Sequence, residues 1–288
     1  MELPYKISEC RTAGNDVNLS ENSETRPWDF FAQNGPVITT AIHAGHSIRY
    51  EILPWLEISE ADRLREEDPM TDYFLGVGDS HLRANQSRFE VDLNRPREKA
   101  ISTNPDDQWG LTIWNSDLPK DQIEKSMQIY DEFYAMIRLH CDKMIERYGR
   151  ILLLDIHSYN HRRDGADAPA APKDENPDID LGATTMNHSI YGKLLNRMAY
   201  QLGNMPVCGR LPDVGVNVRW KDGGHFPEWL HKTYGDDACV ITLEYKKSFM
   251  DEWTGQVDIL ALQHLREGLF RAVDVARDSL RHMTKATL

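Results

Sequence analysis

The sequence has few cysteines, no long apolar run and no excess of positive charge. Its four cysteines, Cys10, Cys141, Cys208 and Cys239, form no C-x-x-C pair, which argues against a disulfide framework and favours a reducing, cytoplasmic compartment. No apolar run approaches the roughly 18 residues that a membrane span needs. The net charge of −13 would repel a phosphate backbone. We therefore expect neither a membrane nor a nucleic acid as partner.

The composition is typical of a soluble globular protein. Of 288 residues, 40% are hydrophobic and 27% charged, and the mean hydropathy is −0.58. Residues 1–35 contain charges throughout and lack the apolar segment of a secretory signal, so we interpret them as an N-terminal arm. No internal repeat or shift in composition marks a second domain. Residues 36–288 are therefore predicted to form one domain.

Buried strands and amphipathic helices alternate along this domain. Apolar runs rich in β-branched residues predict strands at Gly35–His43, Arg150–His157 and Ala238–Tyr245. Apolar residues spaced three or four apart predict helices at Asp121–Tyr148, Ser189–Leu202 and Val257–Met283. The pattern indicates an α/β domain with a mostly parallel or mixed twisted sheet flanked by helices. The segment Asn160–Thr185, rich in Pro, Asp and Ala, is long for a connection, which is typical of functional or disordered loops.

Polar side chains that can bind a metal follow the predicted strands. His43, His46 and His157 offer three imidazoles, and catalytic zinc sites use three protein ligands and leave one position open. Asp155, two residues before His157, could accept the second ring N–H of that histidine, or could support another residue. His81 is a further candidate ligand. Each of these residues alone could instead be structural.

A carboxylate and a cationic cluster complete the candidate site. Glu244 ends an apolar strand and fits the role of a general base, unless it pairs with Lys246. Arg88, Asn94 and Arg95, within "RFEVDLNRPRE", could bind a substrate carboxylate and a developing oxyanion, although an ordinary solvated turn is equally consistent with this stretch.

In order and spacing, these motifs resemble those of the zinc carboxypeptidase-like superfamily. Within it, "HAG", "SRFEVDLNRP", "LDIHSYNHRR", "GGHFPEW" and "EYKKSFMDEWTG" are most similar to the N-formylglutamate amidohydrolase family. The resemblance extends from Pro36 to Leu269. It implies a single-domain zinc carboxypeptidase-like fold.

The resemblance also implies a role for each matched residue. The ligands of one zinc ion would be His43, His46 and His157, with histidine at position 46 where the superfamily has glutamate. Glu244 would be the catalytic base, and Arg88 would polarise the scissile carbonyl. The substrate carboxylates would be bound by Asn94 and Arg95, with Arg162, Arg163 and His225 as further candidates.

The implied reaction is the hydrolysis of N-formyl-L-glutamate to formate and L-glutamate, the end of one histidine-degradation route. Zinc would lower the pKa of its water and polarise the formyl oxygen. The alternatives are an aspartoacylase-like or carboxypeptidase-like hydrolase of another acyl amino acid or peptide, or a metal- or ligand-binding module without turnover. Other divalent metals could also bind such a site.

Overall fold

One mixed sheet of seven strands forms the centre of the protein. The computed structural model describes residues 26–220 and 224–283. The strand order is β1-β3-β2-β4-β7-β5-β6. The strands are β1 (Trp28–Phe31), β2 (Val37–Ala41), β3 (Ser80–Ala84), β4 (Ile151–Tyr159), β5 (Ile179–Gly182), β6 (Val214–Val216) and β7 (Ala238–Lys246). β3, β2, β4 and β7 run parallel, whereas β1 and β5 pair antiparallel with β3 and β7. The predicted α/β class with a single mixed sheet is confirmed.

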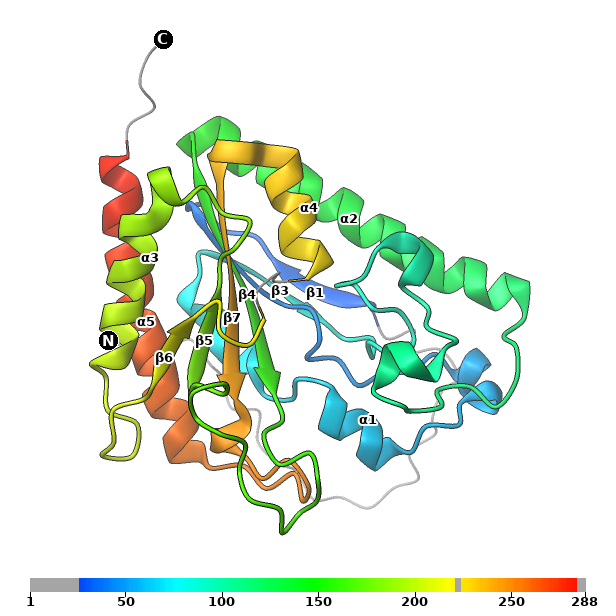
Figure 1. Cartoon of the computed structure of the whole chain (residues 1–288). Helices are drawn as coiled ribbons and strands as arrows, with labels where there is room; N and C mark the ends of the chain where they lie inside the picture. Colours follow the sequence, from blue (N-terminus) through cyan, green and yellow to red (C-terminus); the bar gives the residue numbers. More distant parts are fainter. Residues whose placement is uncertain (1–25, 221–223, 284–288) are drawn as a thin grey trace, which may run out of the picture.

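Helices cover both faces of this sheet (Figure 1). The α-helices are α1 (Glu60–Glu66), α2 (Lys120–Tyr148), α3 (His188–Gly203), α4 (His225–Tyr234) and α5 (Ile259–His282). Short 3₁₀ helices are η1 (Tyr50–Trp55), η2 (Thr71–Val77), η3 (Arg97–Lys99), η4 (Pro105–Gln108), η5 (Gly235–Asp237) and η6 (Lys247–Phe249). α3 and α5 pack on one face, and α2 and α4 on the other. No helix in the described ranges combines the length and apolarity that crossing a membrane requires.

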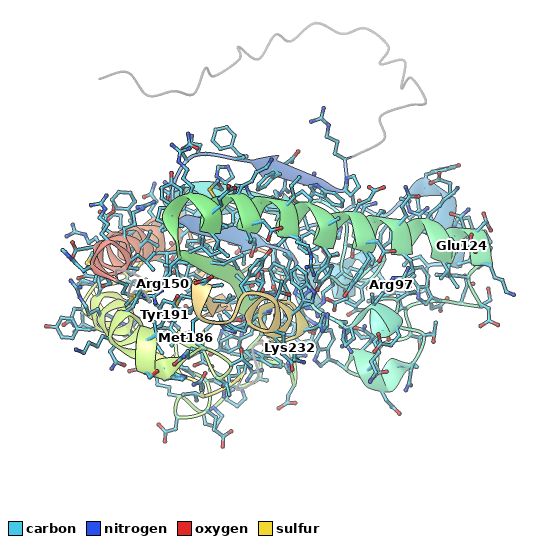
Figure 2. All side chains as sticks on the ribbon, turned by 90° about the horizontal axis from the view of Figure 1, so that it is seen from above. Arg97, Glu124, Arg150, Met186, Tyr191 and Lys232 are labelled. Carbon is cyan, nitrogen blue, oxygen red and sulfur yellow. The ribbon has the colours of Figure 1, made fainter. Side chains whose placement is uncertain are left out.

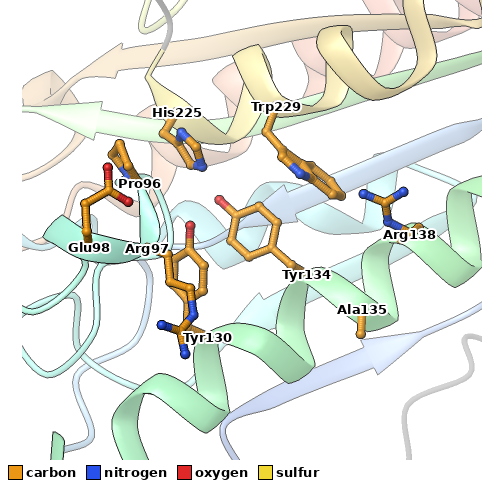
Figure 3. A pocket seen from close by; sticks show the side chains of 9 residues that line it. All are labelled: Pro96, Arg97, Glu98, Tyr130, Tyr134, Ala135, Arg138, His225 and Trp229. Atoms are coloured by element: carbon orange, nitrogen blue, oxygen red, sulfur yellow. The ribbon is translucent and has the colours of Figure 1, made fainter. Parts of the chain in front are cut away.

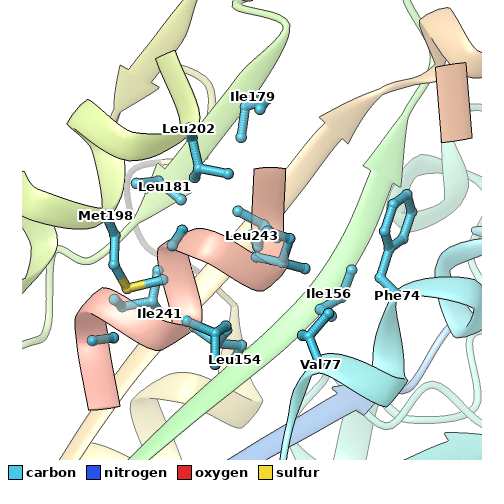
Figure 4. Packing of buried hydrophobic residues seen from close by; sticks show 14 of the residues in the cluster. Phe74, Val77, Leu154, Ile156, Ile179, Leu181, Met198, Leu202, Ile241 and Leu243 are labelled. Atoms are coloured by element: carbon cyan, nitrogen blue, oxygen red, sulfur yellow. The ribbon is translucent and has the colours of Figure 1, made fainter. Parts of the chain in front are cut away.

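The two central strands, β4 and β7, are buried along their whole length because helices cover both of their faces. Side chains alternate between the faces, so Leu154 and Ile156 on β4 and Leu243 on β7 pack towards α3 and α5 (Figure 4). The same alternation directs His157 and Glu244, which are register partners in the parallel pair β4 and β7, towards the opposite face.

On that opposite face α2 lies along the molecule and α4 packs beside it. Seen from above, Glu124 marks one end of α2, and Lys232 lies on the neighbouring α4 (Figure 2). Phe133 of α2 and Phe226 of α4 are buried with ring centroids 5.4 Å apart. This packing fixes the start of α4, whose first residue is His225.

Two strands fall where the sequence predicted an arm and a loop. β1 lies inside the predicted arm of residues 1–35 and is hydrogen-bonded to β3, so the sheet begins before the predicted domain boundary. Residues 1–25 of that arm lie outside the described part of the chain. β5 lies inside the predicted loop Asn160–Thr185 and pairs with β7. Both strands have only four residues, too few for a clear periodic pattern.

Candidate metal and catalytic site

Three buried side chains meet at the carboxyl end of the parallel strands. His43 follows β2, His157 lies near the end of β4, and Asp68 comes from the turn after α1. Each offers one ligand atom, and these atoms lie within 4.8 Å of one another. The backbone N–H of Asp68 donates to the carbonyl of His43 at 3.0 Å, which holds the turn against the end of β2. Two imidazoles and one carboxylate are a donor set that catalytic zinc sites use.

The hydrogen bonds of the two histidines leave the Nδ1 atoms for this group. His43 Nε2 is 2.7 Å from Asp92 Oδ1, and His157 Nε2 is 2.8 Å from Asp155 Oδ2. His157 Nδ1 is 2.8 Å from Asp68 Oδ2, whereas His43 Nδ1 is buried and has no hydrogen-bond partner within the described residues. A carboxylate on one ring nitrogen commonly orients a metal-binding histidine and raises its basicity. The group therefore fits a metal ion.

The charges of the group depend on one another. Burial alone would raise the pKa of Asp68, but the hydrogen bond with His157 and the nearby His43 hold that pKa below its usual value. Burial alone would lower the pKa of His157, but Asp155 and Asp68 hold it well above the usual value. The two shifts favour the charged forms of Asp68 and His157, which lie 2.8 Å apart.

His46 does not join this group, contrary to the predicted H-x-x-H site. Its Nδ1 is 2.5 Å from Glu67 Oε2, and its Nε2 is 3.6 Å from Glu60 Oε1. After His43 the chain turns away from the sheet and forms a bridge between Ser47 and Gln86, so His46 faces α1 instead. The third member of the group of possible ligands is Asp68, whereas the sequence predicted His46.

His81, the other candidate ligand, lies on β3. Its ring stacks on Phe31 with centroids 4.9 Å apart. The structure therefore does not bring His81 into the group of possible ligands.

Glu244 faces the same cleft from β7. Burial raises its pKa to about 8; the neighbouring His157 opposes this shift, and the carboxylate of Asp68 adds to it. A carboxyl group with such a pKa in a cleft is a candidate for acid–base chemistry. The alternative of a Glu244–Lys246 pair is not what the structure shows, because Lys246 Nζ lies 3.3 Å from Asp178 Oδ1.

Asp92 connects the possible metal ligand His43 to the predicted substrate-binding residues. Its Oδ1 also accepts the backbone N–H of Asn94 at 2.9 Å, and its Oδ2 accepts Arg88 Nη2 at 2.7 Å. Arg95 Nε lies 3.4 Å from the same Oδ2. Because Asp92 is fully buried, these four contacts fix the side chains around it. Desolvation would raise the pKa of Asp92, but Arg88 and His43 hold it well below the usual value.

Asn94 joins the site to the start of α4. Its Oδ1 accepts the backbone N–H of Phe226 at 2.9 Å, and its backbone carbonyl accepts the N–H of His225 at 3.3 Å. Gly224 has a φ of 92°, and a Cβ there would meet the Asn94 side chain at 2.4 Å. A glycine is therefore needed at position 224 for this contact with Asn94. Its neighbour Gly223 lies outside the described residues.

The remaining arginines differ in position. Arg163 lines the cleft and donates to both carboxylate oxygens of Glu66, at 3.2 and 3.0 Å. Trp109 lies against both Arg88 and Arg163, with 5.1 and 5.5 Å from its ring to the two guanidinium carbons. Arg162 instead pairs with Asp251 at 2.6 Å and is not among the residues that line the cleft.

The cleft has a volume of about 830 Å³, within the range of about 300–1,000 Å³ that is usual for ligand pockets. It brings together most of the residues that the sequence singled out. The residues on its wall include His43, Asp68, Arg88, Asn94, Arg95, His157, Arg163, His225 and Glu244.

Sequence reasoning missed Asp68 and Asp92. Asp68 ends the acidic run "REED", which is typical of a charged surface. No local pattern in this run indicates that Asp68 points into the protein. Asp92 stands inside the motif "SRFEVDLNRP", where its apolar neighbours Val91 and Leu93 were a signal of burial. A buried aspartate between arginines could have been expected to pair with them.

The fold and site define an α/β protein with a candidate hydrolytic metal centre at the carboxyl ends of its parallel strands. Residues 35–250 match the family described as N-formylglutamate amidohydrolase. Because this match covers most of the chain, the protein belongs to the N-formylglutamate amidohydrolase family, as its motifs indicated. It is therefore a member of a family of amidohydrolase enzymes.

Solved structures support the same fold. The crystal structure of N-formylglutamate amidohydrolase from Ralstonia eutropha JMP134 has a TM-score of 0.71 at 15% identity, covering 90% of this chain and 99% of that chain. A gene product of Agrobacterium tumefaciens has a TM-score of 0.58 at 16% identity, covering 86% of this chain and 95% of that chain. At these identities the likeness concerns the fold alone. A search of curated proteins found no match.

Proposed function

We propose that the protein is a zinc-dependent amidohydrolase that cleaves N-formyl-L-glutamate to formate and L-glutamate. The main support is the buried group of His43, Asp68 and His157 beside Glu244, in a chain that belongs to an amidohydrolase family. We assign the metal to these three ligands, with Asp68 in place of the predicted His46. The reaction would take place in the cytoplasm on a small-molecule substrate.

In the proposed reaction, four residues and the metal each have a separate role. A bound zinc ion would supply Lewis acidity towards the formyl carbonyl and lower the pKa of a water molecule. Glu244 accepts the proton that the water loses and delivers it to the nitrogen of the leaving glutamate. Arg88 donates to the carbonyl oxygen as negative charge develops there. Asp155 and Asp92 hold the two histidines in the required tautomers.

The substrate carboxylates are assigned to Asn94, Arg95 and Arg163. Asn94 uses its Oδ1 in the contact with α4, so its amide Nδ2 remains to donate. Arg95 donates one Nη2 bond to the carbonyl of Asp107 at 2.6 Å, which orients its guanidinium before substrate binds. Oriented guanidinium groups bind carboxylates with good geometry and charge complementarity. His225, at the edge of the same cleft, is a further substrate contact.

The test is formate release from N-formyl-L-glutamate by protein stripped of metal and reloaded with zinc. Glu244→Gln should bind zinc normally but lose about 100-fold or more in kcat, because the amide cannot take up the proton. Glu124→Gln, an exposed change on α2, is the matched control. Normal turnover by Glu244→Gln would show that Glu244 is not the general base. No release by the folded, zinc-loaded protein would exclude formylglutamate as the substrate.

A further inference from the structure

A second hollow lies between α2 and α4, next to the catalytic cleft (Figure 3). Its volume is about 440 Å³, which also lies in the usual range of ligand pockets. Tyr130 and Tyr134 of α2 line one side, and His225 and Trp229 of α4 line the other. We name it the α2/α4 pocket. Of the residues that line it, only His225 has a role in the proposed reaction on formylglutamate.

The α2/α4 pocket adjoins the catalytic cleft. Pro96, Glu98 and His225 line both hollows. The shared residues Pro96 and Glu98 directly follow Asn94 and Arg95, which we assign to the substrate carboxylate. The pocket therefore lies beside the residues that we assign to the substrate carboxylates, on the amino-acid side of the proposed substrate.

Hydrogen bonds and ring contacts fix the walls of the pocket. The hydroxyl of Tyr130 donates to the carbonyl of Arg95, and that of Tyr134 to the carbonyl of Leu93, both at 2.8 Å. Tyr134 and Trp229 meet edge to face, with centroids 4.8 Å apart and an interplanar angle of 87°. Because both hydroxyls are hydrogen-bonded to the backbone, the two tyrosine side chains are held in place. A preformed wall of this kind lowers the entropy lost on binding.

The two arginines that line the pocket, Arg97 and Arg138, are both held by neighbouring side chains. Arg97 is held by Asp131 through two contacts of 2.7 and 2.8 Å. The guanidinium of Arg138 lies over the Trp229 ring, 5.3 Å from its centroid. Aromatic rings and a stacked guanidinium plane favour a planar or apolar group that packs against them.

The catalytic cleft and the α2/α4 pocket together offer two adjoining spaces for one ligand. The cleft of about 830 Å³ and the adjoining pocket of about 440 Å³ each lie in the range that accommodates drug-sized ligands. We propose that the α2/α4 pocket is a subsite of the catalytic cleft, and that it binds an aromatic or long apolar side chain on the amino-acid side of an N-acyl amino acid. This inference rests on the proposed amidohydrolase function and extends its substrate class beyond glutamate.

The experiment compares N-formyl-L-glutamate with N-formyl-L-phenylalanine, two substrates with the same acyl group. Ala135→Trp places a large side chain in the pocket from an exposed position on α2. It should lower the ratio of kcat/KM for the phenylalanine substrate to that for the glutamate substrate by about tenfold or more. Leu139→Trp adds the same side chain at a position that is 57% exposed and does not line the pocket, so this ratio should stay as in the unmodified protein.

Binding separates this inference from the proposed function. In the Glu244→Gln background, calorimetry measures whether N-formyl-L-phenylalanine binds, whether or not the protein hydrolyses any formyl amino acid. Binding that Ala135→Trp weakens and Leu139→Trp does not would support the subsite, even if formylglutamate is not a substrate. Absence of binding, or equal binding by both tryptophan variants, would contradict the proposal that the α2/α4 pocket is a subsite. The hydrolysis of formylglutamate is tested separately, by formate release.

Discussion

Asp92 is the residue on which most of the site geometry depends. It accepts contacts from the possible ligand His43, from Arg88, from Arg95 and from the backbone of Asn94. A fully buried carboxylate with these partners connects the metal group to the substrate-binding residues. Its loss should therefore alter both metal affinity and substrate binding.

Asp92→Asn should reduce zinc affinity by about 10–100-fold, the usual effect of removing a carboxylate that orients a histidine ligand. The amide oxygen can still accept one N–H, but the amide nitrogen cannot accept the N–H of Arg88. Zinc affinity is measured by competition with a chelator of known affinity. Asp274→Asn, at an exposed pair on α5, is the control. Unchanged zinc affinity in Asp92→Asn would contradict the orientation of His43 by Asp92.

At the scale of elements, the junction between Asn94 and α4 depends on one glycine. Gly224→Ala should destabilise the fold by about 1–3 kcal/mol more than Gly110→Ala. Both positions have positive φ, of 92° and 83°, but a Cβ at Gly224 would meet Asn94 whereas one at Gly110 would meet nothing within 4 Å. Urea unfolding of the two variants measures the difference. Equal losses of stability would show that the close contact with Asn94 does not make Gly224→Ala more destabilising than Gly110→Ala.

A pH effect on stability is expected where α4 packs on β7. His231 Nε2 accepts the backbone N–H of Val240 at 3.1 Å, so its Nδ1 carries the proton towards Thr185 Oγ1, 2.6 Å away. Burial lowers the pKa of His231 to about 4. Between a pH of about 6.5 and about 4 the unfolded chain binds a proton at this histidine that the folded protein does not. Stability should therefore fall as the pH drops through this window.

The loss attributable to His231 should be about 1–2 kcal/mol, allowing for its partial exposure. His231→Gln has no titrating group but keeps an acceptor and a donor. The free energies of unfolding of the two proteins, measured by urea from pH 7 to pH 4, should therefore diverge in slope. Parallel pH profiles would mean that His231 does not contribute to the acid sensitivity.

At the scale of the whole molecule, a metal ion would join β2, β4 and the turn after α1. Zinc that binds only the folded protein should raise its stability, by about 2.7 kcal/mol when free zinc is 100 times its dissociation constant. Asp68→Ala should abolish this gain, because it removes one of three ligands. His46→Ala should keep it, since His46 pairs with Glu67 instead.

Thermal unfolding with and without zinc, at fixed protein concentration, tests this assignment. The comparison is between the zinc-dependent shifts in Tm, not between the Tm values, because each substitution also removes an ion pair. A shift that persists in Asp68→Ala and disappears in His46→Ala would restore the H-x-x-H site that the sequence predicted.

The sequence determined the framework of this protein. The uninterrupted apolar runs at β2, β4 and β7 and the three-to-four spacing in α2, α3 and α5 are local patterns, and the structure has these elements within a few residues of the predicted bounds. Parallel strands bring their carboxyl ends to one edge of the sheet, so His43, His157 and Glu244 could be expected near one another. The motif order also identified the family.

Only the tertiary structure decided which acidic residues complete the site. Asp68 reaches His157 across 89 positions of sequence and Asp92 reaches His43 across 49. Such contacts depend on how the chain returns between the strands, which no local period encodes. The same return of the chain turned His46 towards α1, and the packing of α2 against α4 left the α2/α4 pocket beside the cleft. Local pattern fixes elements, whereas burial of whole faces against one another fixes which distant side chains meet.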